Sequence, residues 1–179
     1  MDVAEGAQPE RRRLLVLRHS KASHESGPAD FDRPLTARGH RDAVAVGRQL
    51  ADWATPVDLV LCSPALRTRQ TWEGAVEGGA RAETVEFPRK LYSGDLPDLM
   101  ELVRSAPDSV HGLLVVGHGP AIPELVRELV DPAASAASVL AELDDSYPTS
   151  GLARLSVEGA WSELTAHGAR LEAYAVPRG

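Results

Sequence analysis

Hydrophobic and polar positions along the chain fall into blocks that predict strands and helices in turn. Three blocks are short and almost wholly apolar: LLVL (14–17), VDLVLCS (57–63) and GLLVVGHG (112–119). Such runs are too short for a surface helix and too apolar for an exposed loop, and they are typical of strands buried on both faces of a parallel sheet. We therefore expect three central strands.

Amphipathic segments separate these strands. Thr36 is expected to cap a helix over 37–54, and Ser63 a second helix that runs to residue 77 with Pro64 in its first turn. Further helices are predicted over 95–106 and 120–130, a short strand over 84–87, and two late strands over 151–157 and 170–176. Residues 132–148, rich in Ala and Ser, are expected to form a loop with room for a helical turn. This alternation predicts an α/β fold, a three-layer α/β/α sandwich with a mostly parallel central sheet.

Length and composition bound the organisation of the chain. With 179 residues, of which 43% are hydrophobic, the sequence is long enough for one substantial core. We expect a flexible N-terminal tail over 1–12 and a single domain over 13–179. The net charge of -7 argues against nucleic acid or an anionic membrane as a partner. A single cysteine, Cys62, excludes an internal disulfide and fits a cytoplasmic location, and no apolar run approaches the length of a membrane span.

Charged and polar side chains follow each of the three predicted central strands. Arg18 and His19 follow the first strand, Arg67 follows the second near a helix start, and His118 follows the third. The carboxyl ends of parallel strands meet at one edge of a sheet, where ligands bind. Two arginines, two histidines and a helix N-terminus at that edge suit a dianionic phosphoryl group.

The same residues carry a resemblance to a known family. LRHSKA resembles the first Arg-His signature of the histidine phosphatase superfamily, the phosphoglycerate mutase-like proteins, and SPALRTRQT and VVGHGP resemble its second-arginine and second-histidine motifs. Within that superfamily the sequence is most similar to the SixA-type phosphohistidine phosphatases, through RHSKA, DFDRPLTARG, LCSPALRTRQT, KLYSGD and YPTSGLARL.

The resemblance implies a phosphoglycerate mutase-like fold, no metal or other cofactor, and a covalent phosphohistidine intermediate. It implies that His19 is the nucleophile and that Arg18, Arg67 and His118 form the catalytic phosphate pocket. Lys21, Arg33 and Ser20 are candidate substrate-binding residues. A general acid is harder to place: Asp95 is a candidate, but an Asp directly before an amphipathic run is more typical of a helix N-cap.

The substrate stays open at this stage. We expect hydrolysis of phosphohistidine on a partner protein, such as a phosphotransfer domain or phosphocarrier. The alternatives are a phosphomonoesterase for small phosphorylated metabolites, a phosphoglycerate mutase-like enzyme and a non-catalytic phosphoryl-binding module. The presence of His19 disfavours the last, and the short central region leaves little chain for the lid that a mutase needs.

Overall fold

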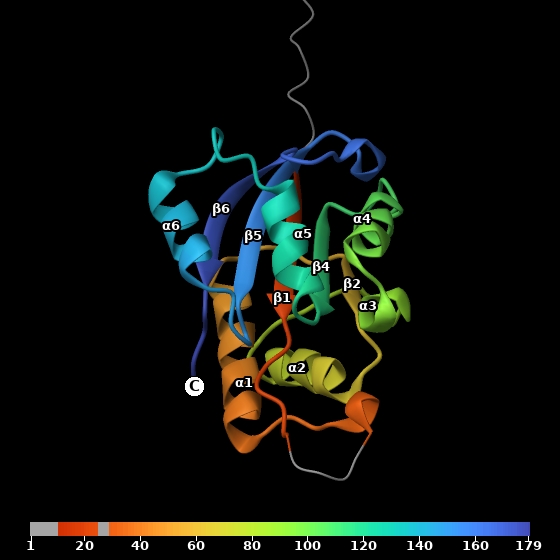
Figure 1. Cartoon of the computed structure of the whole chain (residues 1–179), viewed down its shortest axis with the longest axis vertical. Coiled ribbons are helices and arrows are strands. Elements are labelled where there is room, and N and C mark those ends of the chain that lie inside the picture. Colours follow the sequence, from red (N-terminus) through yellow and green to blue (C-terminus); the bar gives the residue numbers. More distant parts are fainter. Residues whose placement is uncertain (1–10, 25–28) are drawn as a thin grey trace, which may run out of the picture.

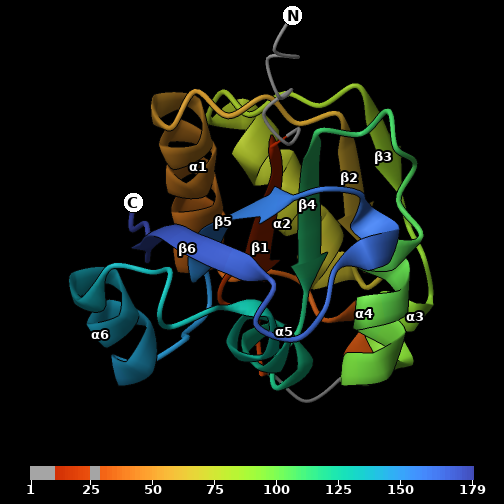
Figure 2. The same cartoon turned by 90° about the horizontal axis from the view of Figure 1, so that it is seen from above.

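The computed structural model describes residues 11–24 and 29–179, and in this part of the chain one six-stranded sheet organises the fold. The strand order is β3-β2-β4-β1-β5-β6, which can be followed across Figure 2. The strands are β1 (Arg11–Arg18), β2 (Leu59–Cys62), β3 (Thr84–Glu86), β4 (Gly112–Gly117), β5 (Leu152–Glu158) and β6 (Ala169–Ala175). Strands β1 to β4 pair in parallel, whereas β5 and β6 add to the β1 edge in antiparallel register.

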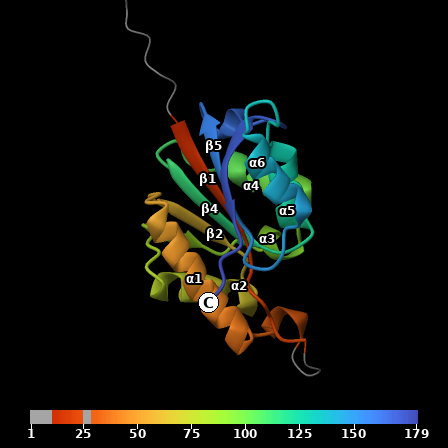
Figure 3. The same ribbon diagram turned by 90° about the vertical axis from the view of Figure 1, so that its left-hand side faces the viewer.

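Helices cover both faces of this sheet (Figures 1 and 3). They are α1 (Ala37–Asp52), α2 (Leu66–Glu77), α3 (Lys90–Ser93), α4 (Leu96–Arg104), α5 (Ala121–Leu129) and α6 (Ala137–Asp145), with 3-10 turns η1 (Asp30–Asp32) and η2 (Trp161–Glu163). The pair α1 and α2 lies on one face, and the remaining helices lie on the other (Figure 3). The predicted three-layer α/β/α sandwich with a mostly parallel sheet is confirmed.

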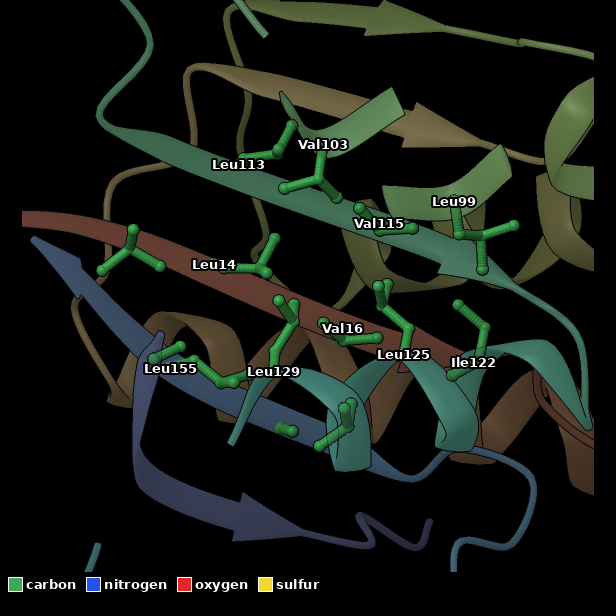
Figure 4. Packing of buried hydrophobic residues seen from close by; sticks show 14 of the residues in the cluster. Leu14, Val16, Leu99, Val103, Leu113, Val115, Ile122, Leu125, Leu129 and Leu155 are labelled. Atoms are coloured by element: carbon green, nitrogen blue, oxygen red, sulfur yellow. The ribbon is translucent and has the colours of Figure 1, made fainter. Parts of the chain in front are cut away.

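Alternate residues of β1 face the two layers, and this divides the core in two. Leu14 and Val16 pack against α4 and α5, as Figure 4 shows, while Leu15 and Leu17 pack against α1 and α2. All four side chains are fully buried. Because residues 14–17 of β1 are shielded from water on both faces of the sheet, this part of the strand has no polar alternation, and its run of Leu and Val follows directly from this position.

Two local predictions about helices were wrong. Ser63 is not the N-cap of α2, because the helix begins at Leu66 and Ala65 holds the cap position. Residues 132–148 contain the nine-residue helix α6 rather than a single turn, since Ala, Leu and Glu favour a helix between the two flanking prolines. Thr36 caps α1 as predicted, with its Oγ1 accepting a hydrogen bond from the Gly39 amide at 3.0 Å.

The N-terminal boundary also differs from the prediction. Arg11 and Arg12 belong to β1 and pair with Glu158 and Val157 of β5, so the strand begins two residues earlier than the expected domain start. The rest of the predicted tail lies outside the described residues. None of the helices in the described part of the chain has the length and apolar character needed to cross a membrane.

Candidate active site

A cavity of about 360 Å³ opens at the carboxyl ends of β1 and β4. Strand β1 ends at Arg18, with His19 directly after it, and β4 ends at Gly117, directly before His118. Because the two strands pair in parallel, the two histidines come together, with ring centroids 5.2 Å apart. The described lining residues are Arg18, His19, Lys21, Ala22, His24, Asp30, Arg33, Arg67, His118, Gly119 and Thr149.

The His19 imidazole is oriented by its own backbone neighbour. Its Nδ1 lies 2.7 Å from the carbonyl oxygen of Ser20. A carbonyl oxygen only accepts hydrogen bonds, so Nδ1 carries the proton and Nε2 of the neutral ring keeps its lone pair. Burial lowers the pKa of His19 to about 4, and the charges of Arg67 and Arg18 act in the same direction, against the hydrogen bond to Ser20. The His19 imidazole is therefore neutral at physiological pH.

His118 lies beside His19 and is also neutral. Burial lowers the pKa of His118 to about 3, and the nearby His19 and Arg67 contribute to the shift. Its Nε2 lies 2.7 Å from the hydroxyl oxygen of Ser63. Its Nδ1 is buried and has no hydrogen-bond partner among the described residues. The neutral His118 ring can thus offer its Nδ1 atom to a bound group.

Arg18 is held by Tyr147, which lies between α6 and β5. Its Nη1 donates to the carbonyl oxygen of Tyr147 at 2.8 Å, and the Tyr147 hydroxyl in turn donates to the carbonyl oxygen of Val16 at 2.7 Å. Gly119 leaves room for the guanidinium group, since a Cβ there would lie 3.1 Å from its Cζ. Tyr147 thus fixes the position of Arg18 at the cavity, while the Nε of Arg18 is buried and has no partner among the described residues.

Arg67, in the first turn of α2, points both ends of its guanidinium group at Asp30. Its Nη1 donates to the Asp30 carbonyl oxygen at 2.6 Å, and its Nη2 donates to the carboxylate Oδ2 at 3.1 Å. The Arg67 side chain is 6% exposed, whereas the Asp30 side chain is 56% exposed. A buried cation is therefore paired with a carboxylate that largely faces water.

Two further side chains bind the same carboxylate. Arg33 donates to Asp30 Oδ1 through Nε at 3.0 Å and pairs with it through Nη2 at 2.8 Å, and the Tyr92 hydroxyl donates to Oδ2 at 3.1 Å. Partial burial raises the pKa of Asp30, but the hydrogen bond from Arg33 and the charge of Arg67 lower it more. The net pKa is below its usual value, so Asp30 is ionised at neutral pH.

A short hydrogen-bond chain ties the His19 loop to the helix that carries Arg67. The Ser20 amide donates to Thr71 Oγ1 at 3.0 Å, and the Thr71 hydroxyl donates to the Arg67 carbonyl oxygen at 2.6 Å. On the other side, the hydroxyl oxygens of Ser20 and Ser150 lie 2.7 Å apart. These contacts fix the spacing of His19 and Arg67 through the backbone.

The structure brings most of the predicted site residues together. Arg18, His19, Arg67 and His118 line one cavity, together with Lys21 and Arg33. Ser20 does not line it, because its side chain is fully buried and its hydroxyl pairs with Ser150. Asp95 does not line it either: its carboxylate accepts a hydrogen bond from the Asp98 amide at 3.3 Å and caps α4, which is the alternative role that its position before an amphipathic run indicated.

The contacts of Asp30 with Arg67 and of Tyr147 with Arg18 were not predicted. Asp30 lies in a segment, DFDRPLTARG, whose only signal was its resemblance to the family, and its contact with Arg67 spans 37 positions of sequence. Tyr147 acts through its backbone carbonyl, which every residue type possesses. Neither contact leaves a pattern in the sequence that hydrophobic periodicity could reveal.

Known proteins are similar to this chain in sequence and in fold. Residues 14–96 match the family model of the histidine phosphatase superfamily (branch 1). An uncharacterized protein of Mycobacterium tuberculosis (strain ATCC 25618 / H37Rv) is 36% identical over 163 residues, which cover 90% of this chain and 100% of the relative.

Solved structures extend the comparison. The putative phosphohistidine phosphatase SixA from Nakamurella multipartitia superposes with a TM-score of 0.82 at 33% identity, covering 96% of this chain and 99% of its own. Phosphoglycerate mutase from Plasmodium falciparum, at 15% identity, shares the fold with a TM-score of 0.61 over 94% of this chain and 93% of its own. The chain thus belongs to the histidine phosphatase superfamily and is a histidine-type phosphatase with a SixA-like structure.

Proposed function

We propose that this protein removes phosphate from phosphohistidine on a partner protein, through a covalent intermediate on His19 and without a metal ion. The observation that carries the proposal is the state of Asp30. It is the one carboxylate among the described residues that line the cavity, and its pKa is lowered by the arginines that bind it. An ionised carboxylate cannot donate a proton to a leaving group.

The first chemical step uses the free electron pair of His19. Nε2 attacks phosphorus, the new N–P bond forms, and the bond from phosphorus to the leaving group breaks in line. The Ser20 carbonyl holds Nδ1–H throughout, and it stabilises the positive charge that the ring gains when Nε2 becomes phosphorylated. The lowered pKa of His19 keeps the ring unprotonated before attack.

The transferring phosphoryl group is stabilised by the arginines. Arg18 and Arg67 both retain a buried Nε that has no partner among the described residues. Guanidinium groups bind phosphoryl oxygens in a planar geometry and neutralise the charge on the equatorial oxygens of the transition state. These two side chains supply the electrostatic stabilisation that a metal ion provides in other phosphatases. Water then attacks the phosphorylated His19 and releases inorganic phosphate.

The leaving group decides between substrate classes. An alkoxide needs a proton from a positioned acid, a contribution of roughly 10²- to 10⁴-fold in rate. The imidazole of phosphohistidine leaves readily once its other ring nitrogen is protonated, and water can supply that proton in an open cleft. A site whose described carboxylate is ionised and paired with arginines therefore loses little on phosphohistidine and much on alkyl phosphates.

The test compares kcat/KM for a phosphohistidine protein, a panel of alkyl phosphates and an aryl phosphate with one preparation. We expect phosphohistidine to be preferred. If a simple alkyl phosphate is the better substrate, the protein is a small-molecule phosphomonoesterase of the same superfamily.

The intermediate is tested separately by rapid quench in alkali, in which a phosphoramidate is stable. Acid-labile, alkali-stable phosphate should appear on the wild-type chain during turnover and be absent from His19→Ala. His40→Ala is the matched control, since His40 is exposed on α1 and pairs with Glu77 at 3.1 Å, away from the cavity lining. Full hydrolysis by His19→Ala would overturn the assignment of the nucleophile.

A further inference from the structure

The carboxylate of Asp30 binds N–H donors of Arg67 and Arg33, two arginines that line the cavity. Its Oδ1 receives the Nε and Nη2 groups of Arg33, and its Oδ2 receives Arg67 Nη2 and the Tyr92 hydroxyl. A carboxylate offers about four lone-pair sites. All of them are therefore filled by the side chains that surround the cavity.

Arg67 shows the conflict most clearly. Both of its terminal nitrogens already donate to Asp30, one to the backbone oxygen and one to the carboxylate. A guanidinium group binds a phosphoryl group best through a pair of parallel N–H donors. In the arrangement seen here, Arg67 keeps its Nε–H free, but it can turn the pair formed by its two terminal nitrogens to a phosphoryl group only if Asp30 gives up at least one of its contacts.

The surroundings of Asp30 permit such an exchange. Its side chain is 56% exposed, so a displaced carboxylate moves into water and keeps its charge solvated. A buried carboxylate would have no such alternative. Asp30 also lies in the three-residue turn η1, so its displacement disrupts no long helix or strand.

We propose that Asp30 is an internal competitor for the phosphoryl site: its carboxylate binds Arg67 and Arg33 in the empty protein, and phosphoryl binding displaces it from Arg67. The inference rests on the proposed function in that the cavity binds a phosphoryl group. The consequence is selectivity among anions. A dianionic phosphoryl group outcompetes a single carboxylate, whereas a free monoanion such as acetate has no advantage over one that is already tethered in place.

The test measures equilibrium binding of inorganic phosphate, orthovanadate and acetate to the whole protein by calorimetry, with no turnover required. The variants are Asp30→Asn and, as control, Asp32→Asn, which removes the same charge two residues along η1 at a position outside the cavity lining. We expect Asp30→Asn to bind phosphate about tenfold more tightly, equivalent to about 1.4 kcal/mol, and to bind acetate. Asp32→Asn should stay within about twofold of the wild type.

A crystal structure of the wild type with orthovanadate supplies a second, direct measurement. The contact between Arg67 Nη2 and Asp30 Oδ2 should be lost, with an oxygen of the vanadate in its place. The inference is overturned if that contact survives beside bound vanadate, or if Asp30→Asn binds phosphate no more tightly than Asp32→Asn. Absence of phosphate and vanadate binding to all three proteins would instead overturn the proposed function, and the inference with it.

Discussion

The hydroxyl oxygen of Ser63 lies 2.7 Å from Nε2 of His118, and this contact joins the start of the α2 region to the end of β4. The Ser63 oxygen also accepts a weak hydrogen bond from the Ala65 amide at 3.5 Å. With its oxygen accepting from the backbone, the hydroxyl can donate its proton to Nε2. His118 Nδ1 then carries the ring proton and can donate to a phosphoryl oxygen.

Removing the Ser63 hydroxyl should therefore affect catalysis as well as stability. We expect Ser63→Ala to lower kcat/KM by about tenfold and the free energy of unfolding by roughly 1–3 kcal/mol, because a buried nitrogen of His118 loses its partner. Ser156→Ala is the matched control, since it removes another buried serine hydroxyl from β5, away from the cavity lining. Steady-state kinetics and urea unfolding measure both effects. An unchanged kcat/KM in Ser63→Ala would contradict this role.

The low pKa of His19 predicts acid-sensitive stability. In the folded chain the pKa is about 4, against an ordinary value of 6.5. Between pH 6.5 and pH 4, His19 is protonated in the unfolded chain but neutral in the folded chain. The free energy of unfolding therefore has its full value above pH 6.5 and declines as the pH falls towards 4. The loss is on the order of 3 kcal/mol for this one group.

This prediction is checked by urea unfolding at several values between pH 7 and pH 4. His19→Asn should show a shallower decline than the wild type, while the exposed control His40→Gln should follow the wild type. Equal slopes for the wild type and His19→Asn would show that the folded state does not depress the pKa of this histidine.

Catalysis is expected to be independent of divalent metal ions. Arg18 and Arg67 bring two permanent positive charges to the cavity, where they can stabilise the negative charge on the phosphoryl oxygens. A chelator should therefore leave kcat and KM unchanged. The control is a metal-dependent phosphatase, which should lose activity in the same buffer. A strict requirement for a divalent cation would refute the mechanism.

Asp95 is expected to matter for folding and not for proton transfer. Its carboxylate caps α4, so Asp95→Ala should cost about 1 kcal/mol of unfolding free energy and leave kcat/KM within about twofold for phosphohistidine and alkyl phosphates alike. Thr36→Ala, which removes the equivalent cap of α1, is the matched control. Selective loss of alkyl phosphate hydrolysis in the Asp95 variant would restore it as the general acid.

The central strands and the four principal site residues could be predicted because each depends on local sequence. A run such as LLVL indicates a strand segment that is buried on both faces. Once the sheet is known to be parallel, Arg18, His19 and His118 are expected at one edge of it. The antiparallel direction of β5 and β6 has no such local signal, since it depends on which edge of the sheet the chain reaches after α6.

The errors arise where tertiary contacts outweigh local preference. A serine followed by a proline is typical of a helix start, but Ser63 uses its hydroxyl for His118, which is 55 positions away in sequence. The role of Asp30 depends in the same way on how η1 folds back onto α2. Pairwise contacts of this kind become visible only once the sheet has fixed the position of both partners.

Cys62, the single cysteine of the chain, lies fully buried at the end of β2. Burial raises the pKa of its thiol to about 12, so the reactive thiolate is essentially absent at physiological pH. Oxidants attack thiolates, and phosphatases that use a cysteine nucleophile are therefore open to inactivation by peroxide. Under the proposed mechanism an imidazole is the nucleophile and catalysis needs no thiol, so peroxide that inactivates a cysteine-dependent phosphatase is expected to leave the activity of this protein unchanged.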